Sequence, residues 1–381
     1  MEVFFVFLLS LGVLNPIYSN ILFSFLYITI IQYIKTKKIL LNSALSINFW
    51  ALFLFGITYF LFGGLKLQHL EFFLITPLLV YSFGWTLIEL RGGKDVDFIK
   101  RIIFAMLIGF GVHAFLNYIS NIGVTRWLLT DFFTGSIQAA TGSGVLNTMI
   151  FSLLAYLLFI EKDKKIKILG LVLEIVACIY SFQLGGRTQL IILGLVFVII
   201  FFFYLFEKKG FVPTFKIIMR LVFLVILVYI VYQLDIFSIK TTIESSNLLL
   251  RLKQGGLEAS DQYRINSVLN GLLLLMNHPF GGQETVFYFH NMWLDVGRVS
   301  GVFPFLFLLL YSVLATYHVL MIFLNKNYNI TIRYLFLSLY LGIQINFFTE
   351  PIMEGAISFF LAFCFLSGLV DYMYYRTRRF L

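Results

Sequence analysis

Two arginines on short polar connections are the side chains best suited to bind an anion. Arg187 follows a Gly185-Gly186 pair in a turn between two long apolar runs. Arg264 follows Tyr263 near the start of an expected helix. A guanidinium offers a planar fork of donors that matches phosphate oxygens, glycine allows close backbone approach, and a helix N-terminus adds free N–H groups. The alternatives are a membrane anchor at Arg187 and an ion pair with a nearby acid at Arg264.

A second set of candidates lies in residues 277–301, whose sequence is NHPFGGQETVFYFHNMWLDVGRVSG. An outward-facing histidine could act as a general base or donate to a phosphate. A neighbouring amide and carboxylate could hold sugar hydroxyls, and an indole could stack on a sugar ring. The residues concerned are His278, His290, Asn291, Trp293 and Asp295. Each of them could equally be a structural polar residue.

Three acids complete the candidates. Glu350 and Glu354 flank the end of a late apolar run and could accept hydrogen bonds from sugar hydroxyls or act as bases. Glu174 lies near the middle of an apolar run, where an ionisable group is a functional hypothesis by default. Alternatively, Glu174 pairs with a polar group on a neighbouring helix, such as His113 or Gln344.

The elements that position these residues must be solvated by lipid. The chain has 381 residues, of which 60% are hydrophobic and only 12% charged, whereas soluble domains carry about 25% charged residues. This composition excludes most cytosolic enzymes, nucleic-acid binders and disulfide-rich secreted proteins. Cys178 and Cys364 lie within apolar runs, so neither a disulfide framework nor a zinc site is expected.

The apolar runs predict an all-α, polytopic membrane bundle, because a bilayer about 30 Å thick needs about 20 apolar residues per helix and lipid leaves only helices or closed barrels. The domain division is 1–234 for nine spans, 235–300 for one large extracytoplasmic loop, and 301–381 for three more spans. The twelve predicted spans are residues 2–14, 17–34, 41–62, 71–90, 100–120, 144–160, 166–184, 189–206, 216–234, 301–324, 332–349 and 355–375.

The net charge of +9 is explained largely by topology rather than by a nucleic-acid partner. Twenty of the 28 basic residues fall in connections that would share one side, which the positive-inside rule assigns to the cytoplasm together with both termini. The eight on the other side are Lys66, Arg126, Arg187, Lys240, Arg251, Lys253, Arg264 and Arg298. Five of these eight lie in the single long loop.

The long loop is expected to be ordered and functional, because loops of more than about 12–15 residues are uncommon in compact folds. Ser260 or Asp261 can cap a helix that runs to about Met276. The leucines of this helix suit a position on the outer membrane interface, although a purely structural cap over the bundle is the alternative.

Absent motifs narrow the chemistry further. The sequence contains no P-loop, no paired aspartates for a metal-bound nucleotide sugar and no HExxH helix. An outer site with arginines, a histidine, acids and aromatic residues fits an anionic, lipid-linked substrate whose energy is already stored in a diphosphate. No metal and no cofactor are expected.

The chain resembles the O-antigen polymerase and ligase superfamily over roughly residues 145–370. The resemblance rests on the span pattern, on SFQLGGRTQL at 181–190, on Arg264 followed by HPFGG and HNMWLDVGRVSG up to Gly301, and on EPIMEG at 350–355. It implies a class C-like glycosyltransferase fold. Arg187 and Arg264 would hold the donor diphosphate, and His290 would act on the acceptor hydroxyl or the diphosphate. Contacts to substrate are expected from Gly186, Tyr263, His278, Asn291, Trp293, Asp295, Glu350 and Glu354.

One departure from the resemblance concerns Gly186, because relatives often have serine or another small residue before the arginine and glycine supplies no hydroxyl. The expected function is polymerisation of undecaprenyl-diphosphate-linked oligosaccharide units on the outer face of a bacterial inner membrane. A ligase that transfers glycan to lipid A core, a flippase or transporter of lipid-linked sugars, and a scaffold are the alternatives. Expected partners are the lipid-linked oligosaccharides, the bilayer, a chain-length regulator and a flippase.

Overall fold

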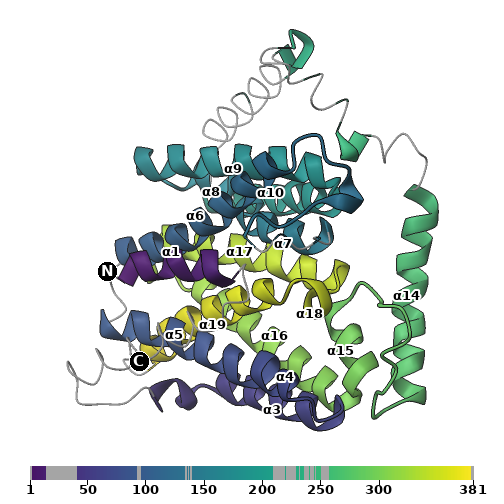
Figure 1. Cartoon of the computed structure of the whole chain (residues 1–381). Coiled ribbons are helices and arrows are strands. Elements are labelled where there is room, and N and C mark those ends of the chain that lie inside the picture. Colours follow the sequence, from purple (N-terminus) through teal and green to yellow (C-terminus); the bar gives the residue numbers. More distant parts are fainter. Residues whose placement is uncertain are drawn as a thin grey trace.

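The computed structural model is almost entirely helical (Figure 1). It describes residues 2–13, 41–91, 96–133, 135, 137, 140–208, 219, 229–230, 232–235, 240, 244, 246–249 and 257–378. Within those residues the only bridge is the isolated pair Thr130 and Ile137. The helices are α1 (Glu2–Val13), α3 (Ile47–Phe62), α4 (Leu67–His69), α5 (Thr76–Leu90), α6 (Val96–Ser120), α7 (Ala140–Phe151), α8 (Leu154–Phe159), α9 (Lys164–Leu184), α10 (Arg187–Lys208), α14 (Leu257–Asn277), α15 (Met292–Ser300), α16 (Val302–Leu324), α17 (Ile330–Thr349), α18 (Ile352–Gly355) and α19 (Ile357–Arg378).

Eight helical stretches in the described part of the chain are long and apolar enough to cross a membrane. They correspond to eight of the twelve predicted spans, which confirms a multi-pass helical architecture. The span predicted at 41–62 is the shorter apolar helix α3, and the one at 2–14 is the 12-residue helix α1. The predicted span 17–34 lies outside the described residues, as does most of 216–234. The eight stretches are Leu67–Leu90, Val96–Ser120, Gly142–Phe159, Lys164–Leu184, Arg187–Glu207, Val302–Leu324, Ile330–Thr349 and Ile357–Arg376.

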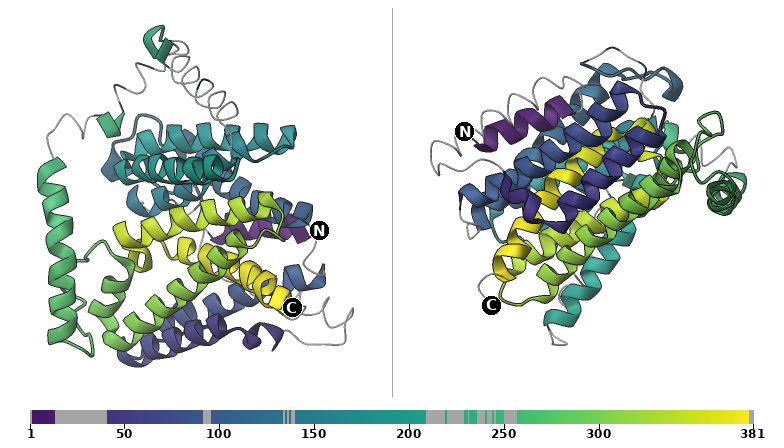
Figure 2. Two further views of the ribbon diagram at one scale, coloured as in Figure 1. Left: turned by 180° about the vertical axis from the view of Figure 1, so that it is seen from behind. Right: turned by 90° about the horizontal axis from the view of Figure 1, so that it is seen from below.

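Helix α14 runs across the ends of the other long helices. It stands upright in Figure 1 and is seen end-on in the right panel of Figure 2, whereas both chain termini lie at the opposite end of the bundle. Its buried Leu275 packs against α15 at Gly297. Its opposite side leaves four apolar side chains exposed at helical spacing, namely Leu269, Leu272, Leu273 and Met276. The predicted helix is therefore confirmed, and its direction is the one that an interfacial helix requires.

The ion pairs of the described residues fall into two groups that match the predicted division into two sides. Lys66 pairs with Glu284, and Arg298 pairs with Glu354, among residues predicted to lie outside. The other end holds Arg91 with Glu2, Lys100 with Glu161, and Arg333 with Glu207. Each of these five pairs stays within one group, as expected if the two sets of charges lie at different ends of the bundle.

Helices α5 and α19 approach each other through a reciprocal pair of glycines. A β-carbon on Gly84 would lie 2.2 Å from the carbonyl oxygen of Phe365, and one on Gly368 would lie 2.0 Å from that of Tyr81. Because lipid is as apolar as a leucine side chain, helices in membranes associate through such close packing of small residues. This contact fixes α19, the last span, against the first half of the bundle.

Replacing Gly368 with valine is expected to lower the stability of the protein by about 1–3 kcal/mol, because the added side chain forces α5 and α19 apart. The matched control is Gly194→Val on α10, where a β-carbon would meet nothing within 4 Å. The midpoint of thermal unfolding in detergent measures both effects. Equal melting of the two variants would contradict the packing described here.

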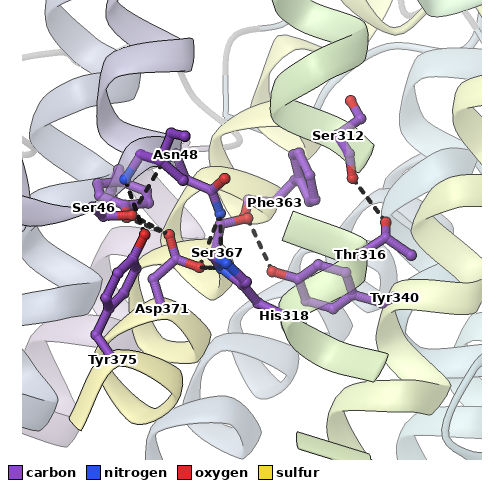
Figure 3. Close-up of polar contacts among 12 residues, drawn as sticks. Ser46, Asn48, Ser312, Thr316, His318, Tyr340, Phe363, Ser367, Asp371 and Tyr375 are labelled. Atoms are coloured by element: carbon purple, nitrogen blue, oxygen red, sulfur yellow. Dashed lines mark hydrogen bonds and ion pairs between the residues drawn. The ribbon is translucent and has the colours of Figure 1, made fainter. Parts of the chain in front are cut away.

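A buried polar network joins four helices near the end that holds both termini (Figure 3). The carboxylate of Asp371 on α19, which is fully buried, accepts hydrogen bonds from Ser46 Oγ (2.9 Å) and Asn48 Nδ2 (2.9 Å) at the start of α3. It also accepts from Tyr81 OH on α5 (2.5 Å) and contacts His318 Nδ1 on α16 (2.7 Å). Buried polar groups are tolerated when they are hydrogen-bonded, and here one carboxylate satisfies four partners.

Candidate functional site

The Arg187 turn is a helix end followed at once by a helix start. Gly185 ends α9 in the left-handed conformation (φ 68°), which glycine adopts without steric cost, and Gly186 N–H then donates to Ser181 O (3.1 Å). A β-carbon on Gly186 would lie 2.4 Å from Gln189 Nε2, so the glycine leaves room for that buried side chain. Arg187 is the first residue of α10 and is half-buried.

Arg126 lies close to Arg187, although nothing in the sequence marked it as a site residue beyond its place among the eight outside cations. It lies in a short 3-10 segment (Arg126–Leu128) between α6 and α7. Burial lowers the pKa of its guanidinium, the nearby Glu350 carboxylate raises it, and the positive charge of Arg187 lowers it. The Arg126 charge therefore interacts with both the Arg187 turn and the end of α17.

Glu350 joins these cations to His290. It follows α17 directly, is buried, and its Oε2 lies 3.8 Å from His290 Nδ1. Four side chains from four separate parts of the chain thus interact in pairs at one end of the bundle: Arg126, Arg187, His290 and Glu350. Cations, a carboxylate and an imidazole in this arrangement could bind an anion and move a proton beside it.

The backbone at His290 is held by Asp295. Asp295 is buried in α15, and its carboxylate accepts hydrogen bonds from the N–H groups of Phe289 (2.6 Å) and Asn291 (3.2 Å). Burial raises the pKa of Asp295, while those two N–H groups and the charges of Arg298 and His290 lower it. His290 lies between Phe289 and Asn291 and takes the left-handed backbone conformation (φ 55°). This conformation is uncommon for a residue other than glycine.

The structure places the neighbouring predicted residues in the framework of α15. Asn291 is the N-cap of α15, where its side chain accepts from Leu294 N–H (3.1 Å). Trp293 is 4% exposed and its indole donates to Ser312 Oγ (3.2 Å) and packs against Phe348. The residue type alone could have indicated this cap, since asparagine is preferred immediately before the start of a helix.

Glu354 and His278 lie next to the site rather than within the four-residue group. Arg298 donates from Nη1 to the carbonyl oxygens of Gln283 (3.1 Å), Glu284 (2.8 Å) and Val286 (2.7 Å), and its Nη2 pairs with Glu354. This buried arginine therefore ties the 283–286 loop to α18. His278 is exposed, and Gln283 Nε2 lies 3.3 Å from its Nδ1.

Tyr263 and Arg264 fall within α14, but their side chains lie outside the described residues. Their predicted role stays a prediction. The intramembrane acid Glu174 is buried, and within the described part of the chain neither of its carboxyl oxygens has a hydrogen-bond partner. The alternative of a Glu174 pair with His113 is wrong, because His113 Nε2 instead contacts Asp131 Oδ2 (2.9 Å).

No protein-family model matches the chain, and no curated protein matches it. In the described part of the chain, no group of three or more His, Cys, Asp or Glu side chains is placed to hold a metal ion. The fold and the contacts define a multi-pass helical membrane protein with arginines, a glutamate and a histidine brought together at one end.

Proposed function

We propose that the chain is a glycosyltransferase that polymerises undecaprenyl-diphosphate-linked oligosaccharide units at the outer face of a bacterial inner membrane. The observation that supports this best is the interaction of Arg126 with Arg187 and Glu350, together with the His290–Glu350 contact. A diphosphate needs cations, and a sugar hydroxyl needs a proton acceptor. Both requirements are met at the end of the bundle to which the charge pattern assigns the outer side.

In the proposed reaction, the acceptor hydroxyl oxygen of one lipid-linked unit attacks the anomeric carbon of the growing glycan. The new C–O bond forms as the bond between the anomeric carbon and the diphosphate oxygen breaks, and undecaprenyl diphosphate leaves with the electron pair. Arg126 and Arg187 stabilise the negative charge that develops on the departing diphosphate. His290 takes the hydroxyl proton, and Glu350, 3.8 Å from Nδ1, stabilises the imidazolium that results.

The decisive experiment is polymerisation by the purified protein in nanodiscs with undecaprenyl-diphosphate-linked units as the only substrate. A ladder of products longer than one unit supports the proposal, and the absence of such products with folded protein contradicts it.

A gene deletion in cells separates a polymerase from a ligase. Deleting a polymerase leaves single-repeat glycans on the surface acceptor, whereas deleting a ligase leaves full-length polymer unattached.

Glu350→Gln is expected to reduce polymerisation by about ten- to a hundredfold while the protein remains folded, because the amide keeps the shape of the side chain but cannot stabilise a charged imidazole. The control is Glu284→Gln, which removes a carboxylate that is half exposed at the same end of the bundle. Rates in the nanodisc assay compare the two variants. Unchanged activity of Glu350→Gln would remove Glu350 from the proposed mechanism.

A flippase remains the second candidate from a different class, and buried Glu174 is the observation that favours it, since an ionisable group within a span is a functional candidate. A flippase would move fluorescent lipid-linked sugar across a proteoliposome membrane without lengthening it. Transport lost in Glu174→Gln would favour this candidate over the polymerase.

A further inference from the structure

The segment that carries Arg126 is closed into a fixed loop by one side chain. Asn121, which is 1% exposed, follows the end of α6 and hydrogen-bonds to both backbone groups of Thr130. Its Oδ1 accepts from Thr130 N–H (2.8 Å), and its Nδ2 donates to Thr130 O (2.8 Å). The side-chain amide therefore pairs with the backbone as a neighbouring strand would, and Arg126 lies midway between the two joined residues.

The far side of the same loop is attached to α6 by two further contacts. Asn117 Oδ1 accepts from Phe132 N–H (2.8 Å), and His113 Nε2 contacts Asp131 Oδ2 (2.9 Å). The side chains of Asn117, His113 and Asp131 are all buried. A loop with this many buried attachments has little freedom to change its path, so the backbone on both sides of Arg126 is fixed to the outer end of α6.

Gln183 attaches this loop to the helix that precedes Arg187. Its Nε2 donates to the carbonyl oxygen of Asn121 (2.6 Å) and approaches that of Tyr118 (3.4 Å). Gln183 belongs to the last turn of α9, and the Gly185-Gly186 turn then leads directly to Arg187. One amide thereby sets the position of the Arg126 loop relative to the Arg187 turn.

Such fixing matters because the positive charge of Arg187 opposes that of Arg126, while the nearby Glu350 carboxylate favours the Arg126 charge. In a flexible loop, Arg126 could keep its interaction with Glu350 and still turn away from Arg187. Holding the two charges together beforehand removes the reorganisation that binding would otherwise require, which is the basis of electrostatic preorganisation.

We infer that Asn121 is a positioning residue that holds Arg126 beside Arg187, so that the two form a preassembled binding pair for a diphosphate, with Gln183 connecting the two halves. The identity of the ligand rests on the proposed function, whereas the positioning does not. The Asn121 side chain is buried and its amide is paired with the Thr130 backbone, so it is not placed to touch a ligand directly. Its effect passes through Arg126, and this makes a specific prediction for a double variant.

Asn121→Ala is expected to weaken binding of undecaprenyl diphosphate to the protein in nanodiscs by about ten- to a hundredfold. The same substitution in an Arg126→Ala background is expected to change binding no further, because the arginine that it positions is already missing. Asn327→Ala is the control, since that asparagine is exposed at the opposite end of the bundle. If Asn121→Ala does not fold, Asn121→Asp keeps the acceptor for Thr130 N–H, loses the donor to Thr130 O, and takes its place.

A second measurement tests the positioning without any ligand. Spin labels on cysteines introduced at positions 126 and 187, with Cys178 and Cys364 replaced by serine, report the spread of distances between the loop and the turn. We expect a narrow distribution that broadens when Asn121 is replaced. Additive effects on binding, or an unchanged distribution, would overturn the inference. If the wild-type protein binds no diphosphate, but replacing Asn121 still broadens the distance distribution, the proposed function is refuted and the positioning role of Asn121 stands.

Discussion

Arg187→Ala is expected to lower polymer synthesis by about a hundred- to a thousandfold, the loss typical when one preorganised group that stabilises a developing charge is removed. Arg126→Ala should behave in the same way, because in the proposed mechanism both guanidinium groups act on the same departing diphosphate. Lysine at position 187 should restore little of the activity, since a point charge cannot reproduce the two parallel donors of the arginine fork.

The length and amount of surface polymer in cells measure this effect, with the level of membrane protein followed in parallel. Lys66→Ala is the matched control, because this lysine lies at the same end of the bundle but is half exposed and pairs only with Glu284 within the described residues. Normal polymer in Arg187→Ala cells that contain the protein would show that the site has been assigned wrongly.

Asp371→Leu is expected to destabilise the protein by about 3–5 kcal/mol, which is the usual effect of removing one partner from a buried ion pair. Four donors lose their acceptor at once: Ser46, Asn48, Tyr81 and His318. Each stranded buried group adds its own desolvation penalty. Because the network joins α3, α5, α16 and α19, we expect loss of folded protein rather than a change in the product.

Thermal unfolding in detergent measures this loss, and Asp97→Asn is the control, because that carboxylate is 77% exposed. The double variant Asp371→Leu with His318→Phe should recover part of the stability, since well-packed apolar groups can replace a buried ion pair. A single variant that melts like the wild type would mean that the network contributes no net stability.

The spans could be predicted from the sequence because lipid imposes a length and an apolar composition on every crossing helix. The separation of charges into two ends could also be predicted, since the distribution of Lys and Arg follows from insertion into the membrane. Both are properties of local sequence and need no knowledge of which helices are neighbours.

The composition of the site could be predicted only in part, because it depends on contacts between distant segments. His290 and Glu350 were both candidates, yet nothing in the spacing of the chain indicates that they touch. Arg126 has no glycine pair beside it, and its importance follows only from the loop that Asn121 closes. Conversely, Trp293 has an aromatic side chain of the kind that stacks on sugar rings, but its indole packs inside the bundle.

His290 occupies a backbone conformation that the rest of the chain largely assigns to glycine. A left-handed residue with a β-carbon costs about 1–2 kcal/mol, and here two hydrogen bonds to Asp295 enforce that conformation. Glycine would relieve the strain and leave the fold more stable. The proposed role of His290 would give this strain a purpose, because strained backbone positions are concentrated at functional sites, where stability is given up for activity.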